Sequence, residues 1–164
     1  MNMKEIKVTI NEKTQLYNQF NNSQLSDELS QYLYNQCRGL SVKTDFKIII
    51  NHNFFMNDEE KKKLVDEIRE NYGIDIKENL ISLKMERIKE FFYMLIGVVL
   101  LFISILFANK SSSLVSEIFL IFGWYLLWEI GHSITFFSNI IIKNKRYKKL
   151  INAKIIFCEY DEKK

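Results

Sequence analysis

Two long apolar segments divide the chain into parts of different character. Residues 91–108 (FFYMLIGVVLLFISILFA) carry no charge, and residues 118–142 (IFLIFGWYLLWEIGHSITFFSNIII) carry only Glu129 and His132 as acidic or basic groups. At about 1.5 Å of rise per residue, each segment can cross a hydrocarbon layer of about 30 Å. Core helices of a soluble protein are the alternative, but two such segments in succession disfavour them. The pattern therefore predicts two transmembrane helices.

The charges that flank these segments predict how they are oriented. Lys84, Arg87 and Lys89 precede the first segment, and a basic cluster follows the second: Lys143, Lys145, Arg146, Lys148 and Lys149. Residues 109–117 between the segments form a short loop with one lysine and one glutamate. Because cytoplasmic flanks carry the excess of basic residues, the loop is expected outside and both termini in the cytosol. The first ten residues show no apolar core of a signal peptide, which agrees.

The polar N-terminal part alternates between strand and helix patterns. Residues 4–10 and 43–51 place apolar side chains at every second position, as half-buried strands do. Residues 23–36 repeat apolar positions at helical spacing, with Ser23 or Ser26 as the N-cap and Gly39 as the end. These patterns predict a strand, a helix and a second strand in that order.

Further helices lead into and out of the apolar segments. Asn57 and Glu60 have the spacing of a capping box, so a helix is expected to begin there and to end at Gly73. A second helix from Asp75 is expected to continue through the first apolar segment. After the second segment, the helix is expected to reach about Leu150, and residues 153–160 form a final strand.

The only strands available to pair with that final strand are the two near the N-terminus. The fold class predicted is thus an α+β membrane protein: a two-helix transmembrane hairpin with a small cytosolic α/β layer built from both tails. The expected parts are a cytosolic α/β domain at residues 1–90, membrane helices at 91–108 and 118–142, an external loop at 109–117, and a basic helix with the last strand at 143–164.

Composition limits the classes of function that the chain is expected to have. Residues 1–90 hold 14 Lys or Arg against 15 Asp or Glu, so a nucleic-acid partner is not expected. Cys37 and Cys158 form no metal-binding or disulfide pattern and are interpreted as buried, reduced residues. His52 has no catalytic neighbours in sequence and is interpreted as structural. The absence of proline and the richness in Asn, Ile and Lys indicate an AT-rich, bacterial genome.

Glu129 is the most informative candidate residue. It lies near the middle of the second apolar segment, where a carboxylate costs several kcal/mol and requires a partner, a proton or water. His132 follows at Glu-x-x-His spacing, which occurs in di-metal helical bundles. Three interpretations remain open: a polar pair that fixes helix packing or oligomer state, an oligomeric proton or ion path, and a metal site shared between copies. The first is favoured, and no cofactor is expected.

Other residues of the second segment have simpler interpretations. The basic cluster Lys143–Lys149 sets the topology and contacts lipid headgroups. Trp124, Tyr125 and Trp128 lie away from the ends of the segment, so they are expected to pack between helices rather than to anchor at the interface. Gly97, Gly123 and Gly131 permit close helix approach.

The stretch GWYLLWEIGH followed by KNKRYKKLINAKIIF resembles a broad group of small bacterial two-span membrane proteins. That group has a polar N-terminal part, a Trp-x-x-x-Glu or similar pattern late in the second span, a basic helix and a short last strand. The resemblance covers roughly the C-terminal half of the chain. It implies a bacterial inner-membrane location and supplies no activity or catalytic residue.

The function expected is that of a membrane protein rather than an enzyme, since phosphate-binding loops and nucleophile motifs are missing from the sequence. It would act by self-association and by binding a cytosolic protein, as a membrane effector or immunity-type protein. The alternatives are an oligomeric pore lined by Glu129 and His132, and a metal-dependent membrane enzyme that uses the same two residues. Expected partners are the lipid bilayer and further copies of the chain.

Overall fold

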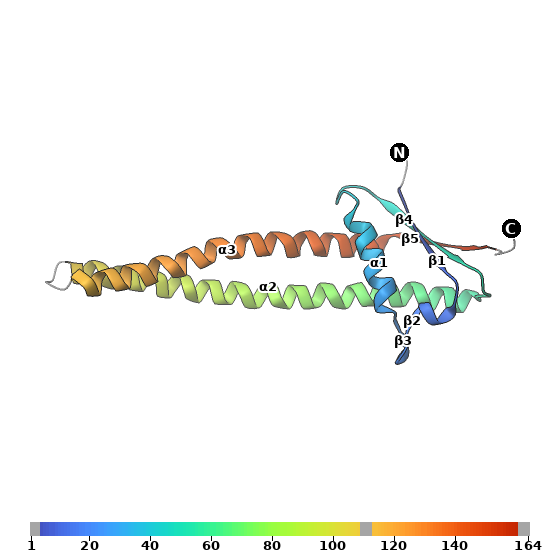
Figure 1. Cartoon of the computed structure of the whole chain (residues 1–164), viewed down its shortest axis with the longest axis horizontal. Helices are drawn as coiled ribbons and strands as arrows, with labels where there is room; N and C mark the ends of the chain where they lie inside the picture. The colour runs from blue at the N-terminus through green and yellow to red at the C-terminus, as the bar shows by residue number, and fades with distance from the viewer. Residues whose placement is uncertain (1–3, 109–112, 161–164) are drawn as a thin grey trace. The chain divides into compact units, whose positions relative to one another are not determined.

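A computed structural model describes residues 4–108 and 113–160. The chain is mostly helical, with a three-stranded sheet and a two-stranded one (Figure 1). It divides into two compact units. Unit 1 comprises Met1–Glu78 and Ile142–Lys164, and unit 2 comprises Asn79–Ile141. Each tail of the chain thus contributes to unit 1.

The main sheet of unit 1 joins the two tails. Its strands are β1 (Lys4–Ile10), β4 (Phe46–His52) and β5 (Lys154–Glu159), in the order β1-β4-β5, and both pairs are parallel. Between β1 and β4 lie the 3-10 turn η1 (Lys13–Gln15), the short antiparallel pair β2 (Tyr17–Asn18) and β3 (Asn21–Leu25), and helix α1 (Asp27–Arg38). The expected pairing of the last strand with the N-terminal strands is confirmed.

The core of unit 1 lies on one face of this sheet. Alternate side chains of β1 and β4 are buried, as the period of two requires. They join buried residues of α1, of α2 (Asp58–Ala108) and of α3 (Ser113–Asn152) in one cluster, which includes Ile48, Ile50, Leu33, Leu64, Ile68, Tyr72 and Leu150. Three helices therefore supply the layer that packs on the sheet.

Helix α1 begins and ends at the residues its sequence indicates. Of the two candidate caps, Ser26 is the N-cap, and its hydroxyl accepts from the Leu29 amide at 3.2 Å. Gly39 is the C-cap in a right-handed conformation. Leu29, Leu33 and Cys37 form the buried stripe. Satisfying the free amides of the first turn in this way stabilises a helix by about 1 kcal/mol.

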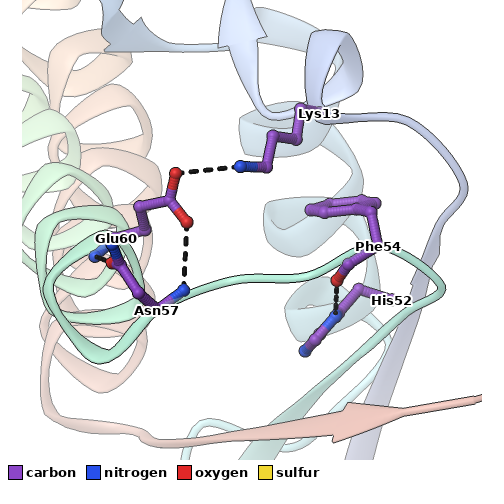
Figure 2. A network of polar contacts seen from close by, with 5 residues as sticks. All are labelled: Lys13, His52, Phe54, Asn57 and Glu60. Carbon is purple, nitrogen blue, oxygen red and sulfur yellow. Dashed lines mark hydrogen bonds and ion pairs between the residues drawn. The ribbon is translucent and has the colours of Figure 1, made fainter.

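Figure 2 shows the contacts that fix the start of α2. The Glu60 amide donates to Asn57 Oδ1 at 2.7 Å, and the Asn57 amide donates to the Glu60 carboxylate at 3.0 Å, which confirms the capping box. Lys13 Nζ reaches the same carboxylate at 2.9 Å and ties η1 to the helix. Nearby, His52 is buried with Nδ1 2.8 Å from the Phe54 carbonyl oxygen, as a structural histidine would be.

The expected end of a helix at Gly73 is wrong, because α2 continues from Asp58 to Ala108 without a break. None of the glycines in the described residues has a positive φ, so Gly73 does not adopt the left-handed conformation of a helix end. Tyr72 and Ile76, on either side, belong to or pack against the core. Tertiary contacts thus stabilise the helix at Gly73, a residue of low helix propensity.

Gly73→Ala is expected to stabilise unit 1 by about 0.5–1 kcal/mol, since alanine costs less backbone entropy inside a helix. A Cβ at position 73 would meet no atom within 4 Å, so nothing opposes the gain. Chemical unfolding of the purified protein, followed by the helical circular dichroism signal, measures it. A lower midpoint for the alanine variant would contradict a continuous helix at this position.

Unit 2 consists of the remaining parts of α2 and α3. Both helices contain segments long and apolar enough to cross a membrane, with mean hydropathies of 2.8 and 1.5. The side chains of these segments are mostly exposed rather than buried within the chain. Helix α3 begins at Ser113, so residues 113–117 of the predicted loop are helical, and residues 109–112 lie outside the described part of the chain.

Candidate functional site

Small residues form the seam between the two helices of unit 2. A Cβ added to Gly97 would lie 3.3 Å from the Gly123 carbonyl oxygen and 3.4 Å from the Leu127 side chain. Further along, the Ser104 hydroxyl donates to the Ser116 carbonyl at 2.9 Å, and the Ser116 hydroxyl donates to the Ser104 carbonyl at 2.8 Å. Close packing and reciprocal hydrogen bonds are the interactions that hold helices together where water is absent.

The register of this seam places Glu129 near the charged end of the first apolar segment. Gly123 lies opposite Gly97, so six residues further on Glu129 comes level with Phe91. The Glu86 carboxylate is the main cause that raises the pKa of Lys89, and the negative charge of Glu129 adds to the shift. The sequence alone placed Glu129 at mid-segment with no cation in reach. The antiparallel pairing brings it toward Lys89 instead.

Glu129 and His132 do not form a closed pair. Glu129 is partly buried, whereas His132 is exposed. The Ser133 hydroxyl donates to the backbone carbonyl of Glu129 at 3.3 Å and so belongs to the helix itself. Within the described residues, no group of three or more His, Cys, Asp or Glu side chains could hold a metal ion. A metal at Glu129 and His132 would therefore need ligands from another copy.

The aromatic residues expected to pack between helices do not lie in the seam between α2 and α3. Trp124, Tyr125 and Trp128 are 62 %, 61 % and 76 % exposed, because the seam is occupied by smaller side chains. Exposed residues follow one another along α3 at alternating spacings of four and three, which we call the α3 stripe: Leu114, Ile118, Ile121, Tyr125, Trp128 and His132. That spacing keeps a continuous row of side chains toward a neighbouring helix.

The five residues of the basic cluster differ in their contacts and exposure. Lys149 Nζ donates to the Thr44 carbonyl at 2.7 Å and lies 3.2 Å from the Asp45 carboxylate. These contacts link α3 to the residues just before β4. Lys143 Nζ lies 5.4 Å from the centroid of the Tyr147 ring. Arg146 is partly buried, and only Lys145 and Lys148 are exposed. Of the five residues predicted to contact lipid headgroups, two are thus exposed on the surface.

The two cysteines have different environments. Cys37 is 2 % exposed in the core, and its burial raises the pKa of the thiol. Cys158 is exposed on β5, so the expectation that both are buried is wrong for Cys158. Its strand lies at the edge of the sheet, and none of the residues of the strand is fully buried. Neither cysteine has a disulfide partner among the described residues.

Unit 1 also contains a polar cavity that the sequence did not indicate. It has a volume of about 550 Å³ and lies among the β2–β3 pair, the start of α1, and α2. Its polar lining includes three carboxylates, from Asp27, Glu67 and Glu70. The only signal in the sequence is the spacing of Glu67 and Glu70 on one side of α2, which equally describes a solvated helix face.

Comparison with known proteins adds no further assignment. No protein-family model matches the chain, and neither the curated proteins nor the solved structures contain a match. The resemblance to small bacterial two-span membrane proteins therefore stays a prediction.

Proposed function

We propose that this chain is an integral membrane protein that acts without catalysis, through self-association of its two-helix hairpin and through binding of a cytosolic partner by unit 1. The observation that carries the proposal is the α3 stripe, a row of large exposed side chains that ends in an imidazole. A self-associating bacterial inner-membrane protein with both termini in the cytosol is the form that we propose.

The exposed surface of unit 2 supports the membrane location. Its two helices expose side chains such as Leu95, Val98, Phe102 and Ile105 on α2, each about half exposed or more. A contiguous apolar surface of this kind is costly in water and stable in lipid. The polar groups at the seam, Ser104 and Ser116, are meanwhile paired with each other. Such internal pairing is what a membrane interior requires of polar groups.

The composition of the α3 stripe supports self-association. Tyr125, Trp128 and His132 each carry a ring with a polar atom, and all three side chains are exposed. A second copy of α3 would bury these rings in the heptad geometry that their spacing provides. It would also supply polar partners for groups that lipid tails cannot satisfy.

Trp128→Ala is expected to shift the protein from oligomer toward monomer, since it removes the largest exposed ring of the stripe. Loss of one such anchor typically weakens association by about 2 kcal/mol or more, close to thirtyfold in the dissociation constant. Analytical ultracentrifugation in density-matched detergent measures the change. The matched control is Phe122→Ala, which removes a ring that is 58 % exposed on the same helix but outside the stripe.

An equal loss of association in both variants would mean that the stripe has no special role. A wild-type protein that is monomeric at every detergent ratio would overturn self-association altogether. The membrane location is tested separately: extraction of the wild-type protein from bacterial membranes by high salt alone, without detergent, would contradict it.

A further inference from the structure

A groove of about 530 Å³ runs along one side of α2, just before the first apolar segment. It belongs wholly to unit 2, and its lining residues recur at helical spacing: Leu80, Leu83, Lys84, Arg87, Ile88 and Phe91. Four of these residues are apolar, two are basic and none is acidic. Apolar walls reduce the screening of charge by water, so the two cations attract an anion more strongly here than they would beside polar walls.

Lys84 and Arg87 are not paired with acids of the chain itself. The helix positions three and four residues away from Lys84 hold no acid, since they are occupied by Leu80, Ile81, Arg87 and Ile88. Among the residues that the structure describes, neither cation forms an ion pair. Lys89, by contrast, lies 3.1 Å from the Glu86 carboxylate. Two like charges one turn apart destabilise a helix slightly, so Lys84 and Arg87 gain from an external anion.

The Arg87 guanidinium is positioned by the other helix of unit 2. Its central carbon lies over the Phe137 ring of α3, 5.8 Å from the ring centroid. A guanidinium over an aromatic ring keeps the N–H groups at its edge free, and these groups bind phosphate oxygens in pairs. Part of the conformational freedom that this side chain would lose on binding is therefore already lost.

The depth of the two cations matches the headgroup layer of a bilayer. Phe91 is the first residue of the apolar segment, and at about 1.5 Å per residue Arg87 lies about 6 Å and Lys84 about 10 Å before it along the helix. The polar layer on each side of the hydrocarbon is about 5–8 Å thick. Ile88 and Phe91 lie at the end of the groove nearest the hydrocarbon, where acyl chains begin. Basic pockets at this depth suit lipids with anionic headgroups.

We propose that this groove binds one anionic phospholipid, whose phosphate lies between Lys84 and Arg87 and whose acyl chains follow Ile88 and Phe91 into the bilayer. The inference rests on the membrane location proposed above, but not on self-association or on a cytosolic partner. It gives α2 a lipid site of its own, separate from the headgroup contacts predicted for the basic cluster of α3.

Native mass spectrometry of the full-length protein in detergent tests the proposal, with phosphatidylglycerol and phosphatidylcholine of the same acyl chains as probes. The first phosphatidylglycerol should bind at least about tenfold more tightly than phosphatidylcholine. Lys84→Gln together with Arg87→Gln should remove that preference by weakening the binding of phosphatidylglycerol. Both positions are exposed, and glutamine has a helix propensity close to that of lysine and arginine, so this double variant is expected to fold.

A control with the same change of charge is Lys145→Gln together with Lys148→Gln, which removes the two exposed cations of the basic cluster. It should change the affinity for the first phosphatidylglycerol less than about twofold. Equal weakening by both double variants would mean general attraction to a basic surface and would overturn the groove as a site. Inorganic phosphate in large excess should not displace the lipid. Displacement would identify free phosphate as the ligand and would overturn the lipid assignment.

Failure of the lipid site can be distinguished from failure of the proposed function. A wild-type protein that stays in the membrane at high salt but binds both lipids equally overturns the lipid site alone. Because native mass spectrometry resolves monomers from oligomers, a protein that is only monomeric and still prefers phosphatidylglycerol keeps the lipid site and contradicts self-association. An oligomer without bound lipid, beside a monomer that binds it, would mean that a second copy covers the groove, which overturns the proposal.

Discussion

Gly123→Val should loosen the seam between the two helices of unit 2. A Cβ at position 123 would lie 2.8 Å from Leu101 Cδ2 and 3.1 Å from the Gly97 carbonyl oxygen. The leucine can rotate away, but the carbonyl is backbone, so the helices must separate. Overpacking of this kind costs about 1–3 kcal/mol. Unfolding by SDS titration from mild detergent, at a protein concentration that keeps the chain monomeric, measures the loss.

Gly131→Val is the matched control, since it makes the same change eight residues further along the same helix, where no atom lies within 4 Å of the new Cβ. Valine costs the same rotamer freedom at both positions, so the difference between the two variants isolates the contact. If Gly123→Val unfolds at the same SDS fraction as Gly131→Val, the helices are not in contact at Gly97 and Gly123.

Tyr72→Ala is expected to destabilise unit 1 by about 3–5 kcal/mol, the usual cost of deleting a buried aromatic side chain. Tyr72 is fully buried, and its ring stacks on Tyr147 with centroids 5.3 Å apart. The stack joins α2 to α3 within unit 1. Because small domains are stable by only about 5–15 kcal/mol, the variant should be close to unfolding at 25 °C. Chemical unfolding monitored by tyrosine fluorescence and circular dichroism gives the value.

Tyr72→Phe separates the ring from its hydroxyl. The hydroxyl donates to the Ser30 carbonyl at 2.8 Å, and burial raises the pKa of Tyr72, so the group stays a proton donor at neutral pH. Its loss should cost about 1 kcal/mol. A phenylalanine variant as unstable as the alanine variant would show that the hydrogen bond, not the packing, holds α2 against α1.

The elements of unit 1 could be predicted because each has a local signal. The alternation in β1 and β4, the Ser26 cap and the Asn57–Glu60 capping box are all short-range patterns, and the structure contains each of them. Gly73 misled the prediction, because the burial of its neighbour Tyr72 outweighs the propensity of one residue.

The candidate site could not be predicted in the same detail, because it depends on how segments far apart in the sequence align with each other. Nothing near Glu129 in the sequence indicates that Lys89 approaches it, since that follows from the contact of Gly97 with Gly123. The exposure of Trp128 has the same origin, because small residues occupy the seam. The environment of Glu67 depends on how the β2–β3 pair lies against α2, which no local pattern specifies.

The position of β5 beside β4 has a consequence for biosynthesis. The ribosome completes β4 before the two apolar helices and β5 only after them, so the sheet of unit 1 stays unfinished until both helices have emerged. Both strands must then be in the same compartment in order to pair. In the membrane arrangement proposed above, a chain that inserted only one of its helices would leave β4 and β5 on opposite sides of the bilayer, unable to pair. Closure of the sheet in that arrangement therefore requires an even number of membrane crossings.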